Sequence, residues 1–201
     1  MILAVPIVAA ILLALAFGGK TSKLNTVPMR HLVVIVLGFV VQLKAMTWAA
    51  DGTVGSLGYR LVLMGGFGLT VLGFVCLRRL PFMAIPLIGL AMNLTVMVAN
   101  GGTMVLTPDA ASADGFRIVA PRGEVRLWGG KDVLRPWDET ALPFLSDWLT
   151  VRVGSFIRIL SPGDVTLATG LGIVVFALMK DLKTPDTLSI RKPRLLAVTG
   201  G

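Results

Sequence analysis

The sequence predicts an all-α integral membrane protein with about five transmembrane helices and a small extracytoplasmic cap. Hydrophobic residues make up 55% of the 201 residues, and the mean hydropathy is +0.83. Soluble domains are usually about 45–50% apolar. The apolar residues are also gathered in long continuous runs, and in lipid only helices or closed barrels satisfy every backbone polar group. Because the runs do not alternate, they favour helices.

Five apolar runs predict the five helices. They are Ile2–Phe17, His31–Ala50, Leu61–Leu77, Pro81–Ala99 and Val165–Met179. The last run is short for a span, but it can begin earlier, around Ile159. The first run has no preceding Lys or Arg and is followed by Lys20 and Lys23, which reverses the charge order of a secretory signal. We therefore expect a first helix that is retained.

The basic residues are expected on one side of the membrane. Ten lie in the loop after the first run, in the loop after the third run or in the tail: Lys20, Lys23, Arg30, Arg78, Arg79, Lys180, Lys183, Arg191, Lys192 and Arg194. With five spans these segments share a side, which the positive-inside rule makes cytoplasmic. The sequence thus predicts a multi-pass membrane protein with its N-terminus outside and its C-terminus cytoplasmic. The charge of +8 then needs no nucleic-acid partner, and no nucleic-acid motif is present.

The chain divides into four expected parts. These are a four-helix membrane part (1–100), an extracytoplasmic cap (101–160), a fifth transmembrane helix (161–180) and a cytoplasmic tail (181–201), loosely ordered after Lys183. Within the cap, Phe116–Ala120 and Glu124–Trp128 flank Pro121-Arg122-Gly123. Turn residues between two such short stretches predict a β-hairpin.

A second cap segment has an amphipathic pattern. From Leu142 to Leu149 the apolar residues are expected on one face, with Ser146 and Asp147 on another. Such a segment favours a position at the membrane surface. Three tryptophans would form an interfacial aromatic belt beside it: Trp128, Trp137 and Trp148.

Polar residues in the fourth helix are the first site candidates. Asn93 and Asn100 are seven residues apart on one helix face, and Gly89 lies four residues before Asn93. For Asn93, hydrogen bonding between helices, with Gly89 allowing close approach, is favoured over ligand binding. For Asn100-Gly101-Gly102, a binding role and a helix stop both remain open.

Acidic residues give the second set of candidates. Ser161 can cap the last helix, with Asp164 three residues on as in a capping box. Alternatively, Asp164 and Asp147 brought together away from water would share a proton, which suits general acid–base chemistry. Lys44, in the outer half of the second helix, is expected to snorkel to the interface rather than pair with a loop carboxylate.

Other kinds of site are not indicated. His31 is the only histidine and Cys76 the only cysteine, which argues against a metal cluster and rules out an internal disulfide. No phosphate loop or dinucleotide motif is present. We expect no metal and no cofactor.

The chain as a whole resembles an uncharacterised bacterial family of small polytopic membrane proteins, domain of unknown function 5317. The resemblance is carried by the glycine-ended first helix, by Asn100-Gly101-Gly102-x-Met104 and by Ser161-x-Gly163-Asp164 at the start of the last helix. It implies a polytopic membrane fold and brings no established activity.

Three short segments are similar to motifs of the lipoprotein signal peptidases, which are membrane aspartyl proteases. They are Asn100-Gly101-Gly102, Phe144-Leu145-Ser146-Asp147-Trp148 and Leu160-Ser161-Pro162-Gly163-Asp164. The resemblance implies that Asp147 and Asp164 form a catalytic pair. Ser161 stands where that family has asparagine, and its Asn-x-x-Asp-Arg motif is not present.

The favoured function is a non-catalytic membrane accessory or binding protein. Its cap would engage a lipid, a hydrophobic ligand or another membrane protein. The candidate binding residues are Asn93, Asn100, Gly101, Gly102, Lys44 and Ser161. The alternative is an aspartyl hydrolase acting at the outer interface with Asp147 and Asp164. A small transporter is a third hypothesis, although broken helices and paired repeats are not evident.

Overall fold

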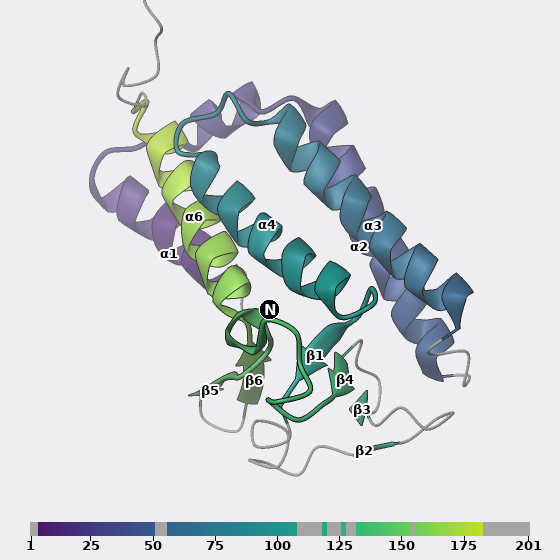
Figure 1. Ribbon diagram of the computed structural model, residues 1–201. Coiled ribbons are helices and arrows are strands. Elements are labelled where there is room, and N and C mark those ends of the chain that lie inside the picture. Colours follow the sequence, from purple (N-terminus) through teal and green to yellow (C-terminus); the bar gives the residue numbers. More distant parts are fainter. Residues whose placement is uncertain are drawn as a thin grey trace, which may run out of the picture.

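The computed structural model describes residues 4–50, 56–107, 118–119, 126–127, 132–153 and 156–182. The described fold is mostly helical. Helices α1 (Ala4–Ala16), α2 (Met29–Ala50), α3 (Leu57–Cys76), α4 (Ala84–Ala99) and α6 (Pro162–Met179) form a bundle, and a β-containing cap lies at one end (Figure 1). Each of the five apolar runs thus contains a helix.

Two described helices, α3 and α6, are long and apolar enough to cross a membrane by length and composition. At 1.5 Å per residue they measure about 30 and 27 Å, against a hydrocarbon core of about 30 Å. Helices α1 and α4 are shorter and also apolar, and α2 has 22 residues. A 3₁₀ helix, η1 (Thr21–Thr26), lies between α1 and α2.

The helices pack in two groups. Helix α2 lies along α3, whereas α6 packs against both α1 and α4 (Figure 1). Between α2 and α3 the backbones approach closely, because a Cβ added at Gly66 would lie 2.9 Å from the Gly38 carbonyl oxygen. In the same interface Gln42 Nε2 donates to Thr70 Oγ1 at 3.1 Å. The α2–α3 pair is therefore held by close packing and by polar contact.

The outward faces of the helices carry large apolar side chains. More than half of the side-chain surface is exposed at Val8, Leu12, Val36, Leu61 and Ile88. A helix on the surface of a water-soluble protein usually has charged or polar residues on this face. The bundle thus presents to its surroundings the kind of surface that hydrocarbon accommodates.

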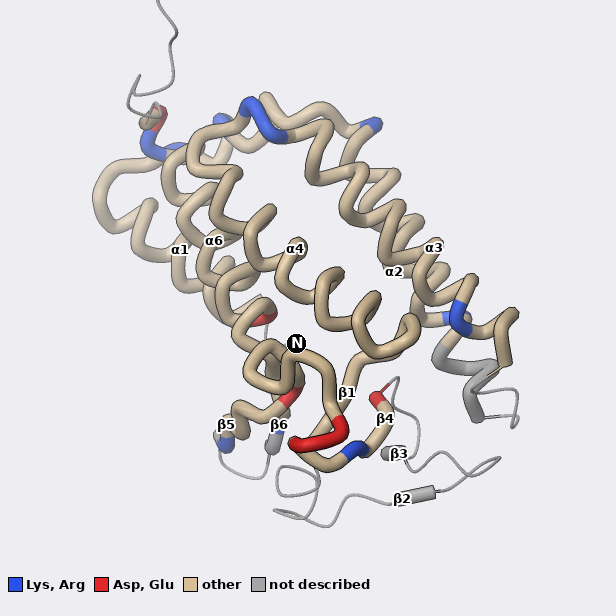
Figure 2. Tube along the Cα trace, viewed as in Figure 1, with Lys and Arg blue, Asp and Glu red and all other residues tan. Residues whose placement is uncertain are grey.

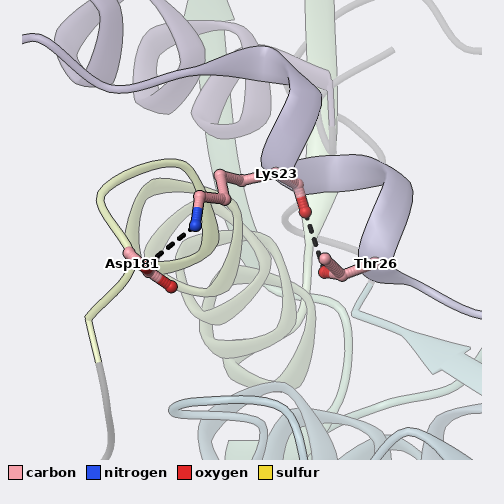
Figure 3. A network of polar contacts seen from close by, with 3 residues as sticks. All are labelled: Lys23, Thr26 and Asp181. Carbon is pink, nitrogen blue, oxygen red and sulfur yellow. Dashed lines mark hydrogen bonds and ion pairs between the residues drawn. The ribbon is translucent and has the colours of Figure 1, made fainter.

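The helix ends opposite the cap are basic (Figure 2). The described residues there are Lys20, Lys23, Arg30, Arg78, Arg79, Lys180 and the acidic Asp181. Lys23 Nζ lies 2.9 Å from Asp181 Oδ2, and Thr26 Oγ1 donates to the Lys23 carbonyl oxygen at 2.8 Å (Figure 3). This ion pair is exposed and contributes little to stability, but it ties η1 to the end of α6.

Strand β1 (Met104–Leu106) is the end strand of the four-stranded sheet in the cap. It pairs in parallel with β4 (Asp132–Leu134), and Leu106 also forms a parallel bridge to Asp147. Strand β2 (Ile118–Val119) pairs antiparallel with β3 (Arg126–Leu127), which pairs in turn with β4. The β2–β3 pairing confirms the hairpin expected here, although its turn residues Pro121-Arg122-Gly123 lie outside the described residues.

A second hairpin, β5 (Leu149–Val153) with β6 (Phe156–Leu160), was not expected from the sequence. The suggestion that the last helix begins near Ile159 is therefore wrong. Ile159 pairs with Thr150 in this hairpin, and α6 begins at Pro162. Proline favours the first position of a helix because its fixed φ is already helical and it has no N–H to satisfy.

The segment from Leu142 to Leu149 also differs from expectation. It forms a single 3₁₀ turn, η3 (Pro143–Leu145), with Ser146 and Asp147 buried and Phe144 and Trp148 exposed. Ser146 Oγ donates to the Pro143 carbonyl oxygen at 2.6 Å, and the Asp147 N–H donates to the Val105 carbonyl oxygen at 2.9 Å. These bonds turn the polar face inward rather than outward.

Trp128 and the tail after Lys183 lie outside the described residues.

Candidate functional site

The start of α6 is held by a capping box. The Asp164 N–H donates to Ser161 Oγ at 2.9 Å, and the Ser161 N–H donates to Asp164 Oδ2 at 3.2 Å. Each bond satisfies a backbone donor that the first turn of a helix leaves without an intrahelical partner. The capping box expected from the sequence is confirmed.

Asn93 of α4 joins this capping box from the neighbouring helix. Its Nδ2 donates to Asp164 Oδ1 at 2.8 Å, and its Oδ1 accepts from Ser161 Oγ at 2.9 Å. Asn93 is 5% exposed and Ser161 is fully buried. Hydrogen bonding between helices is therefore confirmed for Asn93. Of the two Asp164 carboxylate oxygens, Oδ1 accepts from Asn93 and Oδ2 accepts from the Ser161 N–H of the capping box.

Two glycines bring α4 and α6 close enough for this cluster to form. A Cβ at Gly89 would lie 2.5 Å from the Leu167 nitrogen and 2.6 Å from the Gly163 oxygen, and one at Gly163 would overlap Asn93 Oδ1. Real Cβ atoms do not come so near to backbone. The close approach expected at Gly89 is confirmed, and Gly163 has the same role on the opposite helix.

Asn100, at the end of α4, fastens the cap to the bundle. Its Nδ2 donates to the carbonyl oxygens of Val96 and Ala141, both at 2.8 Å. Its Oδ1 accepts from the Ala141 N–H at 3.0 Å and from Arg135 Nη1 at 3.2 Å. With Asn100 only 5% exposed, its amide is occupied in positioning the 135–141 segment.

Gly101 and Gly102 stop helix α4. The Gly102 N–H donates to the Met97 carbonyl oxygen at 2.8 Å and the Gly101 N–H to that of Val98 at 3.2 Å, the two bonds of a Schellman motif. Their φ values of +72° and +88° explain why both positions hold glycine. The Gly101 carbonyl oxygen accepts from Arg60 Nη1 at 3.1 Å, which links α3 to the end of α4.

The structure groups six of the candidates in two clusters. Asn93, Ser161 and Asp164 form one cluster, and Asn100, Gly101 and Gly102 form another. Asp147 is 4% exposed and lies beside β1 in the cap, whereas the contacts of Asp164 are with Asn93 and Ser161. Lys44 is exposed on α2, as snorkelling requires. The described residues include no group of three metal-ligating side chains placed to hold an ion.

Sequence reasoning missed two partners of Asn100 and an aromatic face. Arg135 and Ala141 contact Asn100 across more than 30 residues of chain, and no local pattern could have indicated them. The aromatic face consists of Trp137, Phe144 and Trp148, which are 49%, 55% and 41% exposed. The two indoles meet edge to face with ring centroids 6.5 Å apart. Their spacing in the sequence suggested a belt but not this direct contact.

The family comparison covers both polar clusters. The model of a family of unknown function (DUF5317) matches residues 26–176, from η1 into the last turns of α6. The comparison with curated proteins and the comparison with solved structures each gave no match. Since the matched segment is most of the sequence, this chain belongs to the DUF5317 family of unknown function.

Proposed function

We propose that this chain is a multi-pass protein of the cytoplasmic membrane that acts as a non-catalytic accessory or binding protein through its outer cap. Five helices would cross the bilayer, with the N-terminus and the cap outside. The exposed apolar faces of the helices support the insertion. The basic helix ends opposite the cap support the orientation, since such residues favour the cytoplasmic side.

The aromatic face of the cap carries the binding part of the proposal. The cap buries Ser146 and Asp147 while Trp137, Phe144 and Trp148 remain exposed. Apolar side chains gathered on a surface mark a site that contacts lipid or a partner, and indole rings favour the membrane interface. η3 contacts both α4 and α6, so this face lies close to where the bundle ends. Its occupant would be a lipid, a hydrophobic ligand or another membrane protein.

Cysteine labelling tests the orientation and the covered face together. In a Cys76→Ser background, Asn25→Cys, Asp138→Cys and Phe144→Cys place single thiols on η1, on the cap and on the aromatic face. A membrane-impermeant maleimide added to intact spheroplasts should label position 138 and not position 25. Position 144 should stay unlabelled until detergent is added, although Phe144 and Asp138 are both exposed in the structure.

Positions 25 and 144 test different parts of the proposal. Labelling of position 25 from outside would overturn the orientation. Labelling of position 144 as fast as position 138 would show that water covers the aromatic face and would overturn the binding proposal. Labelling of all three after detergent is added provides the control for thiol reactivity.

An aspartyl hydrolase is the second candidate function. The observation that favours it is the burial of Asp147 in a cap that adjoins the first turn of α6, where Asp164 lies. A catalytic pair requires both carboxylates to act on one substrate. The hydrogen bonds of Asp164 to Asn93 and Ser161 account for its presence without such chemistry.

Substitution of the two aspartates separates these functions. We expect Asp164→Ala to lower stability by about 0.5–2 kcal/mol, as for loss of a helix cap, and Asp164→Asn to lower it less. Asp147→Asn and Asp164→Asn should each complement deletion of the gene as well as the parent gene does. Unfolding in detergent measures the stability effect, and complementation measures the function. Two well-folded asparagine variants that both fail to complement would establish the hydrolase instead.

A further inference from the structure

A wholly apolar groove runs between α1 and α6, outside both polar clusters. Its volume is about 260 Å³, and its lining consists of Pro6, Ala9, Ala10, Leu13, Thr169, Gly172, Ile173 and Phe176. Small residues line it on both helices, among them Ala9, Ala10 and Gly172. The groove opens to the surroundings of the bundle, which for a membrane protein are acyl chains.

The groove leads to a group of lysines. On α6 the lining residues Thr169, Ile173 and Phe176 are followed, on the same helix face, by Lys180, four residues beyond Phe176. Lys180 Nζ donates to the Phe17 carbonyl oxygen, just past the end of α1. The Lys20 N–H donates to the Met179 carbonyl oxygen at 2.9 Å, so Lys20 lies at the same end of α6.

The charge at this end of the groove is positive. Among the described residues there, Lys23 is paired with Asp181, which leaves Lys20 and Lys180 as the excess charge. Lys20 is exposed. An apolar groove one helical turn from two cations matches a molecule with a hydrocarbon chain and an anionic head.

We propose that an anionic phospholipid of the cytoplasmic leaflet binds here, with an acyl chain in the α1–α6 groove and its phosphate at Lys20 and Lys180. The inference rests on the membrane orientation proposed above and assigns a lipid to a site away from the cap. It does not depend on the aromatic face or on the aspartates. Basic residues attract anionic head groups, and the groove adds the apolar contact that an isolated basic loop lacks.

Native mass spectrometry of the delipidated full chain in neutral detergent tests the proposal. Phosphatidylglycerol and phosphatidylcholine with identical acyl chains are added at equal concentrations. We expect a one-lipid adduct that favours phosphatidylglycerol. Lys20→Gln should weaken this adduct about fivefold, and Lys20→Gln with Lys180→Gln should abolish the preference. Thr169→Phe, which fills the groove at an exposed position, should weaken the adduct with either lipid.

Arg79→Gln is the matched control, because it removes an exposed basic residue from the same side of the bundle but away from the groove. Equal adducts of the two lipids, or an equal loss with Arg79→Gln, would overturn the proposal. An adduct unaffected by Thr169→Phe would also overturn it, since the groove would then be empty. Each outcome is independent of the thiol-labelling result, which alone decides the orientation.

Discussion

Replacing Gly89 with alanine is expected to destabilise the protein by about 3 kcal/mol, near the upper end of what overpacking usually does. The new methyl group would lie 2.5 Å from the Leu167 nitrogen and 2.6 Å from the Gly163 oxygen. Both atoms belong to the backbone of α6, so no side-chain rotation relieves the overlap. The helices must separate, and the bonds from Asn93 to Ser161 and Asp164 weaken as they do.

Gly68→Ala is the matched control for this effect. Gly68 is an exposed helical glycine on α3, and a Cβ there meets nothing within 4 Å. Alanine is favoured over glycine in a helix by about 1 kcal/mol, so this variant should be as stable as the parent or more so. Thermal unfolding of both variants in the same detergent gives the comparison. A Gly89→Ala variant no less stable than Gly68→Ala would contradict the close packing of α4 on α6.

Replacing Asn100 with alanine is expected to lower stability by about 2 kcal/mol and to release the cap locally. The Ala141 N–H and carbonyl group lose their bonds to the Asn100 amide, and Arg135 loses an acceptor. Each hydrogen bond of this kind contributes about 0.5–1.5 kcal/mol. Hydrogen exchange should therefore quicken most in the 135–142 segment, with little change in the middle of α3.

Thr95→Ala controls for the loss of a polar side chain from α4. Thr95 is exposed, and its Oγ1 donates at 2.8 Å to the Ala91 carbonyl oxygen of its own helix. Its removal should leave the exchange of the 135–142 segment unchanged. If Asn100→Ala and Thr95→Ala exchanged alike in that segment, Asn100 would not be the residue that fastens the cap.

The helices could be predicted because their signal is local. A continuous apolar run is enough to indicate a helix, and Ser161 with Asp164 three residues later is enough to indicate its start. Glycine at 89 and asparagine at 93 also indicated a helix contact, although not which helix would be met. The partner helix depends on tertiary packing between segments about 70 residues apart, which a single sequence does not encode in any short pattern.

The cap was harder to predict for two physical reasons. In β5, Thr150 and Arg152 alternate with apolar residues, a period of two that indicates a strand. In β6 apolar residues are adjacent on both sides of Arg158, and such a run does not separate a strand from the start of a helix. The parallel pairing of β1 with β4 joins residues 28 apart, as in Met104 with Asp132. The inward turn of Ser146 and Asp147 depends on that sheet, and so it could not be inferred from the amphipathic pattern alone.

The order of the helices has a consequence for how the proposed membrane protein is made. Helix α6 is the last helix described, yet it packs against both α1 and α4. During synthesis, α4 would enter the bilayer before Ser161 and Asp164 exist, so the Asn93 amide would have no partner on α6. A polar side chain at membrane depth is costly when it faces lipid and usually faces other helices or water, so α4 would not reach its final environment before α6 arrives. Release of the chain as a finished bundle is then coupled to the arrival of its final span.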